Sequence, residues 1–192
     1  EEEYFKSRIS EEILELVDIV FTWGEIPADI IRKKTSFPEE RIYVTGNPRF
    51  DLLLPKLRGI YSQPAKEISK GYGDIILVNT NFTSGNPFSE EKYKEIQTNW
   101  GKDIRENEKR YQEELIQKFI EAVKALSQDI PSHTIIIRPH PSENHEFYRE
   151  KFRETESVVV DHSGDVRSWI YASECVIHNG CTTGIEAALL NK

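Results

Sequence analysis

The chain has 192 residues, of which 30% are charged and 38% hydrophobic, and its formal net charge at pH 7 is −8. This length and composition are typical of a globular protein with one large domain or two small ones. The acidic balance makes the chain a poor general binder of polyanions, so we expect no nucleic acid partner. A local basic pocket is still compatible with this charge.

The sequence contains no apolar run that approaches the roughly 18 residues of a membrane-spanning helix. Any association with a membrane is therefore expected to be peripheral and to involve other parts of the full protein. The two cysteines, Cys175 and Cys181, form neither a CxxC pair nor a disulfide framework, which favours a reducing, cytoplasmic location. The histidines lack the spacing of a metal site, so we predict no metal.

The first third of the chain predicts two strands, each followed by a helix. The predicted elements are a strand within 16–24, a helix over 27–35, a strand over 41–50 that enters a Gly-Asn-Pro turn, and a short helix over 49–54. Residues 55–73 combine prolines and glycines with no clear periodicity, which is typical of an interdomain linker.

The remainder predicts four further strands that alternate with helices. Residues 75–78 form a short apolar run bounded by turn residues, as in a parallel strand covered on both faces. A long helix follows, with an apolar face that runs from Tyr111 to Leu126. The later predicted elements are a strand over 133–138, a helix near 143–153, a strand over 157–161, a helix near 165–172, a strand over 175–178 and a helix from about 183.

This alternation predicts an α/β fold with parallel sheets and right-handed crossovers. Because each side of the linker has few strands, we expect a fragment of a longer protein. Residues 1–54 would be the carboxyl-terminal part of one doubly wound domain, 55–73 the linker, and 74–192 most of a second domain.

The stretch TIIIRPHPSEN, residues 134–144, passes from a buried strand directly into two cationic side chains. Arg138 and His140 each precede a proline, which favours extended backbone, and extended residues two apart face the same side. A guanidinium beside an imidazole would be an anion receptor at the carboxyl end of the strand, where α/β sheets bind ligands. The alternative is a rigid turn in which Arg138 pairs with a local carboxylate such as Glu143.

The stretch HNGCTTGIEAALL, residues 178–190, predicts a second anion site, because a strand there leads through a glycine turn into a helix. Glycines let a phosphate approach the backbone, and threonine hydroxyls add donors. The residues that we expect to contact the anion are Asn179, Gly180, Thr182, Thr183 and Gly184. Glu186 either completes a capping box with Thr183 or binds ribose hydroxyls.

Two further loops carry polar residues that could line a cleft. The first holds Asn79, Asn81 and Thr83, and the second holds Asn47 and Arg49. The alternative in both loops is ordinary turn or helix-capping chemistry, which favours the same residue types.

Four segments occur in an order that resembles the bacterial surface carbohydrate biosynthesis proteins. They are VDIVFTWGE, VTGNPRFDLL, RPHPSEN and HNGCTTGIEAAL, and the resemblance covers most of the chain except 88–130. These proteins look like GT-B glycosyltransferases, similar to capsule and lipopolysaccharide Kdo transferases and, distantly, to nonhydrolysing UDP-GlcNAc 2-epimerases. The resemblance implies two Rossmann-like domains of GT-B type, of which the first is only partly present here.

The resemblance also implies roles for particular residues. His140-Pro141 matches a His-Pro pair that contacts the donor phosphate in related CMP-sugar transferases, and Thr182 and Thr183 match hydroxyl residues that bind phosphate. Glu186 matches a glutamate that binds ribose in the epimerase-like relatives, although it could still serve as a cap. The catalytic carboxylate of such transferases lies in the amino-terminal domain, so we assign no catalytic residue.

The expected function is transfer of a sugar from a CMP- or UDP-linked donor to a glycan or lipid-linked acceptor, with no metal and no other cofactor. The alternatives are a sugar-nucleotide 2-epimerase, a glycerophosphate transferase on the same scaffold, and a non-catalytic assembly protein.

Overall fold

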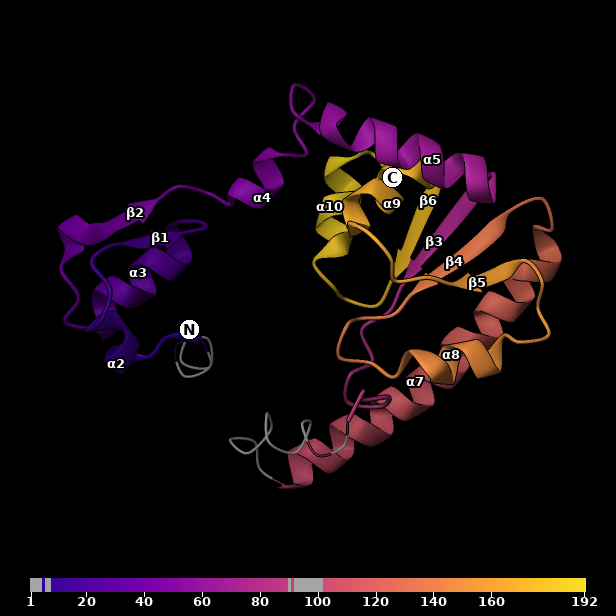
Figure 1. Ribbon diagram of the computed structural model, residues 1–192. Coiled ribbons are helices and arrows are strands. Elements are labelled where there is room, and N and C mark those ends of the chain that lie inside the picture. Colours follow the sequence, from indigo (N-terminus) through magenta and orange to yellow (C-terminus); the bar gives the residue numbers. More distant parts are fainter. Residues whose placement is uncertain (1–4, 6–7, 90, 92–101) are drawn as a thin grey trace. The chain divides into compact units, whose positions relative to one another are not determined.

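The computed structural model describes residues 5, 8–89, 91 and 102–192, with side chains within the last range from 106 onward. The chain divides into two compact units, Glu1–Leu52 and Leu53–Lys192. Figure 1 shows the elements of each unit, and the two units are described separately below.

The first unit contains a small parallel sheet covered by one helix. Strand β1 (Val20–Thr22) pairs with β2 (Ile42–Val44), with Val20 opposite Ile42. Helix α3 (Glu25–Lys34) buries Ala28 and Ile31 against Ile42, which makes the core of this unit. The other elements are α2 (Glu11–Leu14), the 3₁₀ helix η1 (Glu39–Arg41) and α4 (Pro48–Asp51).

The second unit is built on a four-stranded parallel sheet with the order β5-β4-β3-β6. The strands are β3 (Ile75–Asn79), β4 (Thr134–Arg138), β5 (Val158–Val160) and β6 (Cys175–His178). Every residue of β3 is buried, as the apolar run at 75–78 predicts for a central strand.

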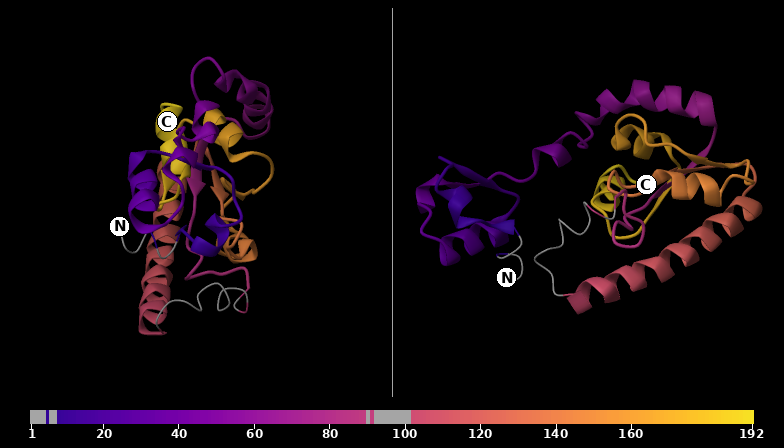
Figure 2. Two further views of the ribbon diagram at one scale, coloured as in Figure 1. Left: turned by 90° about the vertical axis from the view of Figure 1, so that its left-hand side faces the viewer. Right: turned by 60° about the horizontal axis from the view of Figure 1, so that its bottom comes forward.

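Helices cover both faces of this sheet (Figure 1). Helices α5, α9 and α10 lie on one face, and α7 and α8 lie on the other; Figure 2 shows α5 and α7 on opposite sides from a further direction. Their bounds are α5 (Ser62–Tyr72), α7 (Lys102–Asp129), α8 (His145–Lys151), α9 (Val166–Ala172) and α10 (Thr183–Leu189).

The main core lies between the sheet and the α7–α8 layer. Alternate strand residues point into this layer, because successive side chains of a strand face opposite sides. The core combines Ile76 and Val78 of β3 with Ile135 and Ile137 of β4 and with buried residues of both helices. The opposite strand positions, such as Leu77 and Ile136, are equally buried against the other layer.

The predicted parallel α/β architecture is confirmed, but the segment predicted as an interdomain linker without clear periodicity is largely helical. Within 55–73 the structure has the 3₁₀ helix η2 (Arg58–Tyr61) and helix α5, which packs against α9 inside the second unit. Pro64 lies in the first turn of α5, where a missing N–H breaks no helical hydrogen bond. Gly73 ends the helix with φ 73°, so both residue types mark helix ends here.

Other boundaries differ by a few residues. Strands β1 and β2 are shorter than predicted, and α3 begins two residues before Pro27.

Among the described residues, no helix combines the length and the apolar character that a membrane span requires.

Candidate functional site at the carboxyl edge of the second sheet

The candidate site begins where three adjacent strands end. Asn79, the last residue of β3, lies in register with Arg138 at the end of β4 and with His178 at the end of β6. The loops that follow these strands therefore start side by side at one edge of the sheet. This register places segments 138–141 and 178–184 on the same edge, separated by one strand.

Arg138 is buried, and its guanidinium binds backbone carbonyls. Nη1 donates to the carbonyl oxygens of Asp161 (3.3 Å) and Ser163 (2.7 Å), and Nη2 donates to that of Gly164 (3.2 Å). The guanidinium also lies 5.3 Å from the ring centroid of Trp169. Burial lowers the pKa of Arg138, while the charge of Asp161 opposes this shift. Arg138 thus anchors the β5–α9 loop.

This geometry corrects two expectations for Arg138. Its guanidinium is engaged by loop carbonyls instead of being left open to an anion, and in the described part of the chain no ion pair joins it to Glu143. These carbonyls supply the hydrogen-bond acceptors that a buried guanidinium requires, because a buried charge without hydrogen bonds is costly.

Glu143 is instead the centre of a buried network. Its side chain is 0% exposed and accepts hydrogen bonds from the Thr80 hydroxyl (2.9 and 3.1 Å), the Tyr148 hydroxyl and the backbone N–H of His140 (3.0 Å). Burial, together with the nearby charge of Glu143, raises the pKa of Tyr148. The carboxylate therefore joins the loop after β3 to the loop after β4.

A second pair of hydrogen bonds joins the loop after β3 to the loop after β6. The side chain of Asn179 accepts from the backbone N–H of Asn81 (2.7 Å) and donates to the Asn81 carbonyl (3.1 Å). Asn81 and Asn179 were both expected to line the site. The side chain of Asn179 joins the two loops, and Asn81 takes part through its backbone.

The turn before α10 is shaped by His178 and two glycines. Gly180 has φ 75° and donates its N–H to Nδ1 of His178 (3.3 Å). A Cβ on Gly184 would lie 2.3 Å from Cε1 of His178, so only glycine admits the ring here. Sequence reasoning gave His178 no role, although its position at a strand end before a glycine was a usable signal.

The threonines of this turn are arranged differently from a capping box. Thr182 is the N-cap and makes no side-chain capping hydrogen bond, and the Thr183 hydroxyl contacts Sγ of Cys181. Because Thr183 is already inside the helix, the Thr183–Glu186 capping box is not formed. Glu186 is 0% exposed on α10, and its charge acts on Arg167 of α9.

Asn79 is a further buried polar residue at this edge. Its side chain is 3% exposed, and neither its Nδ2 nor its Oδ1 has a hydrogen-bond partner among the described residues. Asn79 is two residues after Leu77 on β3, so it faces the same side, toward the α5–α9–α10 layer that also contains Glu186. Thr83, half-buried in the same loop, makes no contact that assigns it a role.

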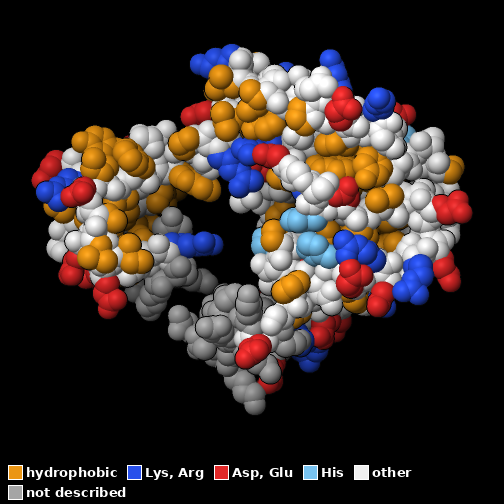
Figure 3. Space-filling view, viewed as in Figure 1, with side chains coloured by type: hydrophobic (Ala, Val, Ile, Leu, Met, Phe, Trp, Pro, Cys, Tyr) orange, Lys and Arg blue, Asp and Glu red, His pale blue; other side chains and the backbone are white. Residues whose placement is uncertain are grey.

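Three histidines lie close together beside Glu143. Nε2 of His145 is 3.2 Å from the carbonyl oxygen of His140, and the rings of His145 and His162 are 4.9 Å apart. Burial lowers the pKa of His162, and the charges of Arg138 and His145 lower it further. A hydrogen bond with the Pro139 carbonyl has the opposite, smaller effect on this pKa. Figure 3 shows histidine side chains gathered on this face of the second unit.

The first-unit residues expected to line a cleft have local roles. The Asn47 side chain caps α4 by accepting from the backbone N–H of Arg49 (3.1 Å), as the capping alternative predicts. Arg49 is exposed.

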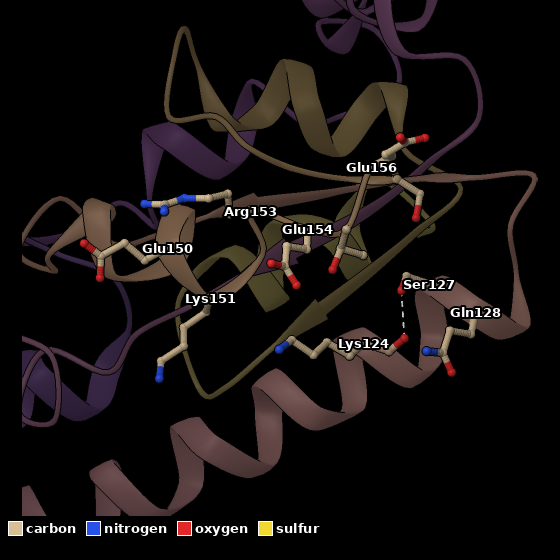
Figure 4. Close-up of a pocket in the computed structure, with 10 residues that line it drawn as sticks. Lys124, Ser127, Gln128, Glu150, Lys151, Arg153, Glu154 and Glu156 are labelled. Atoms are coloured by element: carbon tan, nitrogen blue, oxygen red, sulfur yellow. Dashed lines mark hydrogen bonds between the residues drawn. The ribbon is translucent and has the colours of Figure 1, made fainter.

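A separate polar cavity lies near the opposite end of the sheet, where β5 begins (Figure 4). Its volume is about 820 Å³, and it is lined by side chains of both charges from α7, α8 and the segment before β5. Most of these side chains are solvent-exposed and none is a sequence-predicted site residue. The carboxyl edge has the buried polar groups, so we take it as the candidate site.

In the described part of the chain, no cluster of histidine, cysteine or acidic residues has the geometry of a metal site.

No family model matches the chain, and no curated protein matches its sequence. Solved structures do match. The wall teichoic acid polymerase TagF aligns with a TM-score of 0.55 and 16% identity over 95% of this chain and 39% of that chain. A variant of TagF soaked with CDPG aligns with a TM-score of 0.54 and 14% identity over 95% of this chain and 38% of that chain.

The UDP-GlcNAc 2-epimerase of Methanocaldococcus jannaschii, in complex with UDP-GlcNAc and UDP, aligns with a TM-score of 0.56 and 16% identity. That alignment covers 92% of this chain and 44% of the epimerase. The chain has a GT-B-type α/β fold. It spans less than half the length of the GT-B-type structures that it matches. Because the sequence identity is low, the similarity concerns the fold alone.

Proposed function

We propose that the second unit binds a nucleotide-sugar donor, CMP- or UDP-linked, in a transferase that passes the sugar to a glycan or lipid-linked acceptor of a bacterial surface polysaccharide. The observation that carries this proposal is the joining of three strand-end loops into one edge, beside the buried polar side chains of Asn79 and Glu186. Ligands of open α/β sheets lie at such carboxyl edges.

The chemistry of the edge suits a phosphate group and a ribose. When the nucleotide departs, negative charge develops on a phosphate, and N–H donors in fixed positions stabilise it. His140, the hydroxyl of Thr182 and backbone N–H groups near Gly180 and Gly184 are the donors in this proposal. Glu186 would accept hydrogen bonds from ribose hydroxyls, and Arg138 would contribute through the loop that it anchors.

The comparisons support a nucleotide-linked ligand and also favour two alternative reactions. The solved structures with this fold include a teichoic acid polymerase soaked with CDPG and an epimerase complexed with UDP-GlcNAc and UDP. Similarity to the polymerase favours transfer of glycerophosphate instead of a sugar, and similarity to the epimerase favours isomerisation of the donor.

The binding proposal is tested by titrating the protein with CMP, UDP and CDP in isothermal calorimetry. We expect at least one nucleotide to bind, and His140→Ala to weaken it roughly tenfold, the effect of losing one hydrogen bond to a charged group. His133→Gln is the matched control, because His133 contacts Glu174 near the amino end of β4. Equal affinities in wild type and His140→Ala for every nucleotide would remove His140 from the site.

Product analysis separates the candidate reactions. Sugar transfer releases free nucleotide and adds a sugar to the acceptor, whereas glycerophosphate transfer adds a phosphorylated glycerol. Epimerisation leaves a nucleotide sugar with one inverted centre. Mass spectrometry of the acceptor and chromatography of the nucleotide fraction distinguish all three outcomes.

A further inference from the structure

The turn that carries His140 has its backbone bound on several sides. The Arg138 carbonyl accepts from the Thr80 N–H (3.2 Å), and the His140 N–H donates to Glu143 Oε1 (3.0 Å). The His140 carbonyl accepts from the Glu143 N–H (2.9 Å) and lies 3.2 Å from Nε2 of His145. The backbone is thus fixed by side chains and by a neighbouring loop.

The same turn determines which nitrogen of His140 carries a proton. The backbone N–H of Ser142 donates to Nδ1 of His140 at 3.2 Å. Nδ1 must present its lone pair to accept this bond, so a neutral ring carries its proton on Nε2. Since the His140 side chain is exposed, Nε2–H is a donor that a ligand can reach.

Glu143 connects these two observations. Its carboxylate is held by the hydroxyls of Thr80 and Tyr148 inside the protein, so it cannot turn away from the His140 N–H. The Glu143 N–H in turn holds the His140 carbonyl. Together these bonds close the turn and direct the intervening Ser142 N–H toward the imidazole.

We propose that Glu143 is a positioning residue that holds the Ser142 N–H against Nδ1 of His140 and so fixes the Nε2–H tautomer, so that the loop offers a phosphate group the Nε2–H as a hydrogen-bond donor. The identity of the anion as a nucleotide phosphate rests on the proposed function. The positioning of the imidazole does not.

The first test is NMR of the unliganded protein with ¹⁵N-labelled imidazoles, in which His140→Gln identifies the His140 signals. In wild type at pH 8 we expect the proton on Nε2. Glu143→Leu removes the acceptor and should give a mixture of tautomers, whereas Glu143→Gln keeps an amide oxygen for the His140 N–H and should retain Nε2–H. Glu146→Gln, an exposed change on α8, is the control.

A wild-type proton on Nδ1, or one tautomer mixture shared by wild type and all variants, would overturn the proposal. If Glu143→Leu does not fold, the wild-type spectrum and the Glu143→Gln spectrum still decide it.

The second test is titration of wild type, Glu143→Gln and Glu143→Leu with UDP-GlcNAc. We expect Glu143→Gln to bind within about twofold of wild type and Glu143→Leu to bind more weakly, because its imidazole no longer holds the proton on Nε2 alone. Equal affinity of all three proteins would contradict a contribution of the fixed tautomer to binding. Nε2–H in the NMR spectra with no binding of UDP-GlcNAc would instead reject the proposed function and leave the positioning role intact.

Discussion

At the scale of single residues, partners decide the roles of similar side chains. Arg138 and His140 are two residues apart, yet the guanidinium donates hydrogen bonds to carbonyls of the β5–α9 loop, whereas the imidazole is exposed. The local rule that residues two apart share a side could not supply these partners. They come from a loop more than twenty residues away, which only the tertiary structure brings near.

Two buried asparagines at this edge differ in a way that separates stability from binding. Asn79 has no side-chain hydrogen bond among the described residues, whereas Nδ2 of Asn86 donates to the Asn144 carbonyl (3.0 Å). Both are nearly inaccessible to solvent, at 3% and 7% exposed. A polar group kept in a buried position without a protein partner is a candidate for ligand contact.

For Asn79→Leu we expect unchanged or higher stability, by up to about 2 kcal/mol, because a buried amide without a partner is removed. Nucleotide affinity should fall roughly tenfold if the amide contacts the ligand. Asn86→Leu, the matched control, should lose about 1–3 kcal/mol. Urea unfolding and calorimetry measure both effects. A strongly destabilised Asn79→Leu with full nucleotide affinity would assign Asn79 a purely structural role.

At the scale of elements, the strands were predictable because a short apolar run bounded by turn residues is typical of a buried strand. The segment 75–78 and the strand 175–178 lie where the sequence placed them. Helix α5 was missed because Pro64, Gly71 and Gly73 are typical of loops. Pro64 lies in the first turn and Gly73 ends the helix, where both are tolerated, and packing against α9 outweighs the poor helix propensity of Gly71. Glu186 was ambiguous because a capping glutamate and a ribose-binding glutamate would occupy the same position of the helix.

The loop after β3 is held between a helix and the loop after β4. The Phe88 N–H donates to the Ser142 carbonyl (2.7 Å), and the Asn144 N–H donates to the Asn86 carbonyl (3.0 Å). On its other side, a Cβ on Gly85 would lie 2.9 Å from backbone atoms of Gln112 and Glu113 in α7. The α7 backbone therefore supports this edge of the site.

Gly85→Ala should lower the free energy of unfolding by about 1–3 kcal/mol, because the backbone of α7 cannot yield as a flexible side chain would. Gly71→Ala is the control: its Cβ meets nothing within 4 Å, and alanine near the end of α5 should raise stability by up to about 1 kcal/mol. Thermal unfolding followed by circular dichroism compares the two. Equal stability of the two variants would mean that the loop does not rest on α7.

At the scale of the whole molecule, the order of the strands brings the loops of the candidate site together. Because β3 lies between β4 and β6, the two loops that the sequence singled out flank a third, and Glu143 and Asn179 join all three. Sequence reasoning could propose convergence from the carboxyl-edge rule, but the strand order depends on long-range pairing. The network around Glu143 likewise depends on Thr80, 63 residues away.

The most direct test of the account is a map of nucleotide-induced chemical-shift changes in ¹H–¹⁵N spectra of the protein, recorded with CMP, UDP and CDP. We predict that at least one nucleotide shifts signals in the three segments 79–81, 138–143 and 178–186. Changes confined to the cavity near Lys124, Lys151 and Thr155, or an absence of changes with every nucleotide, would contradict a donor site at the carboxyl edge.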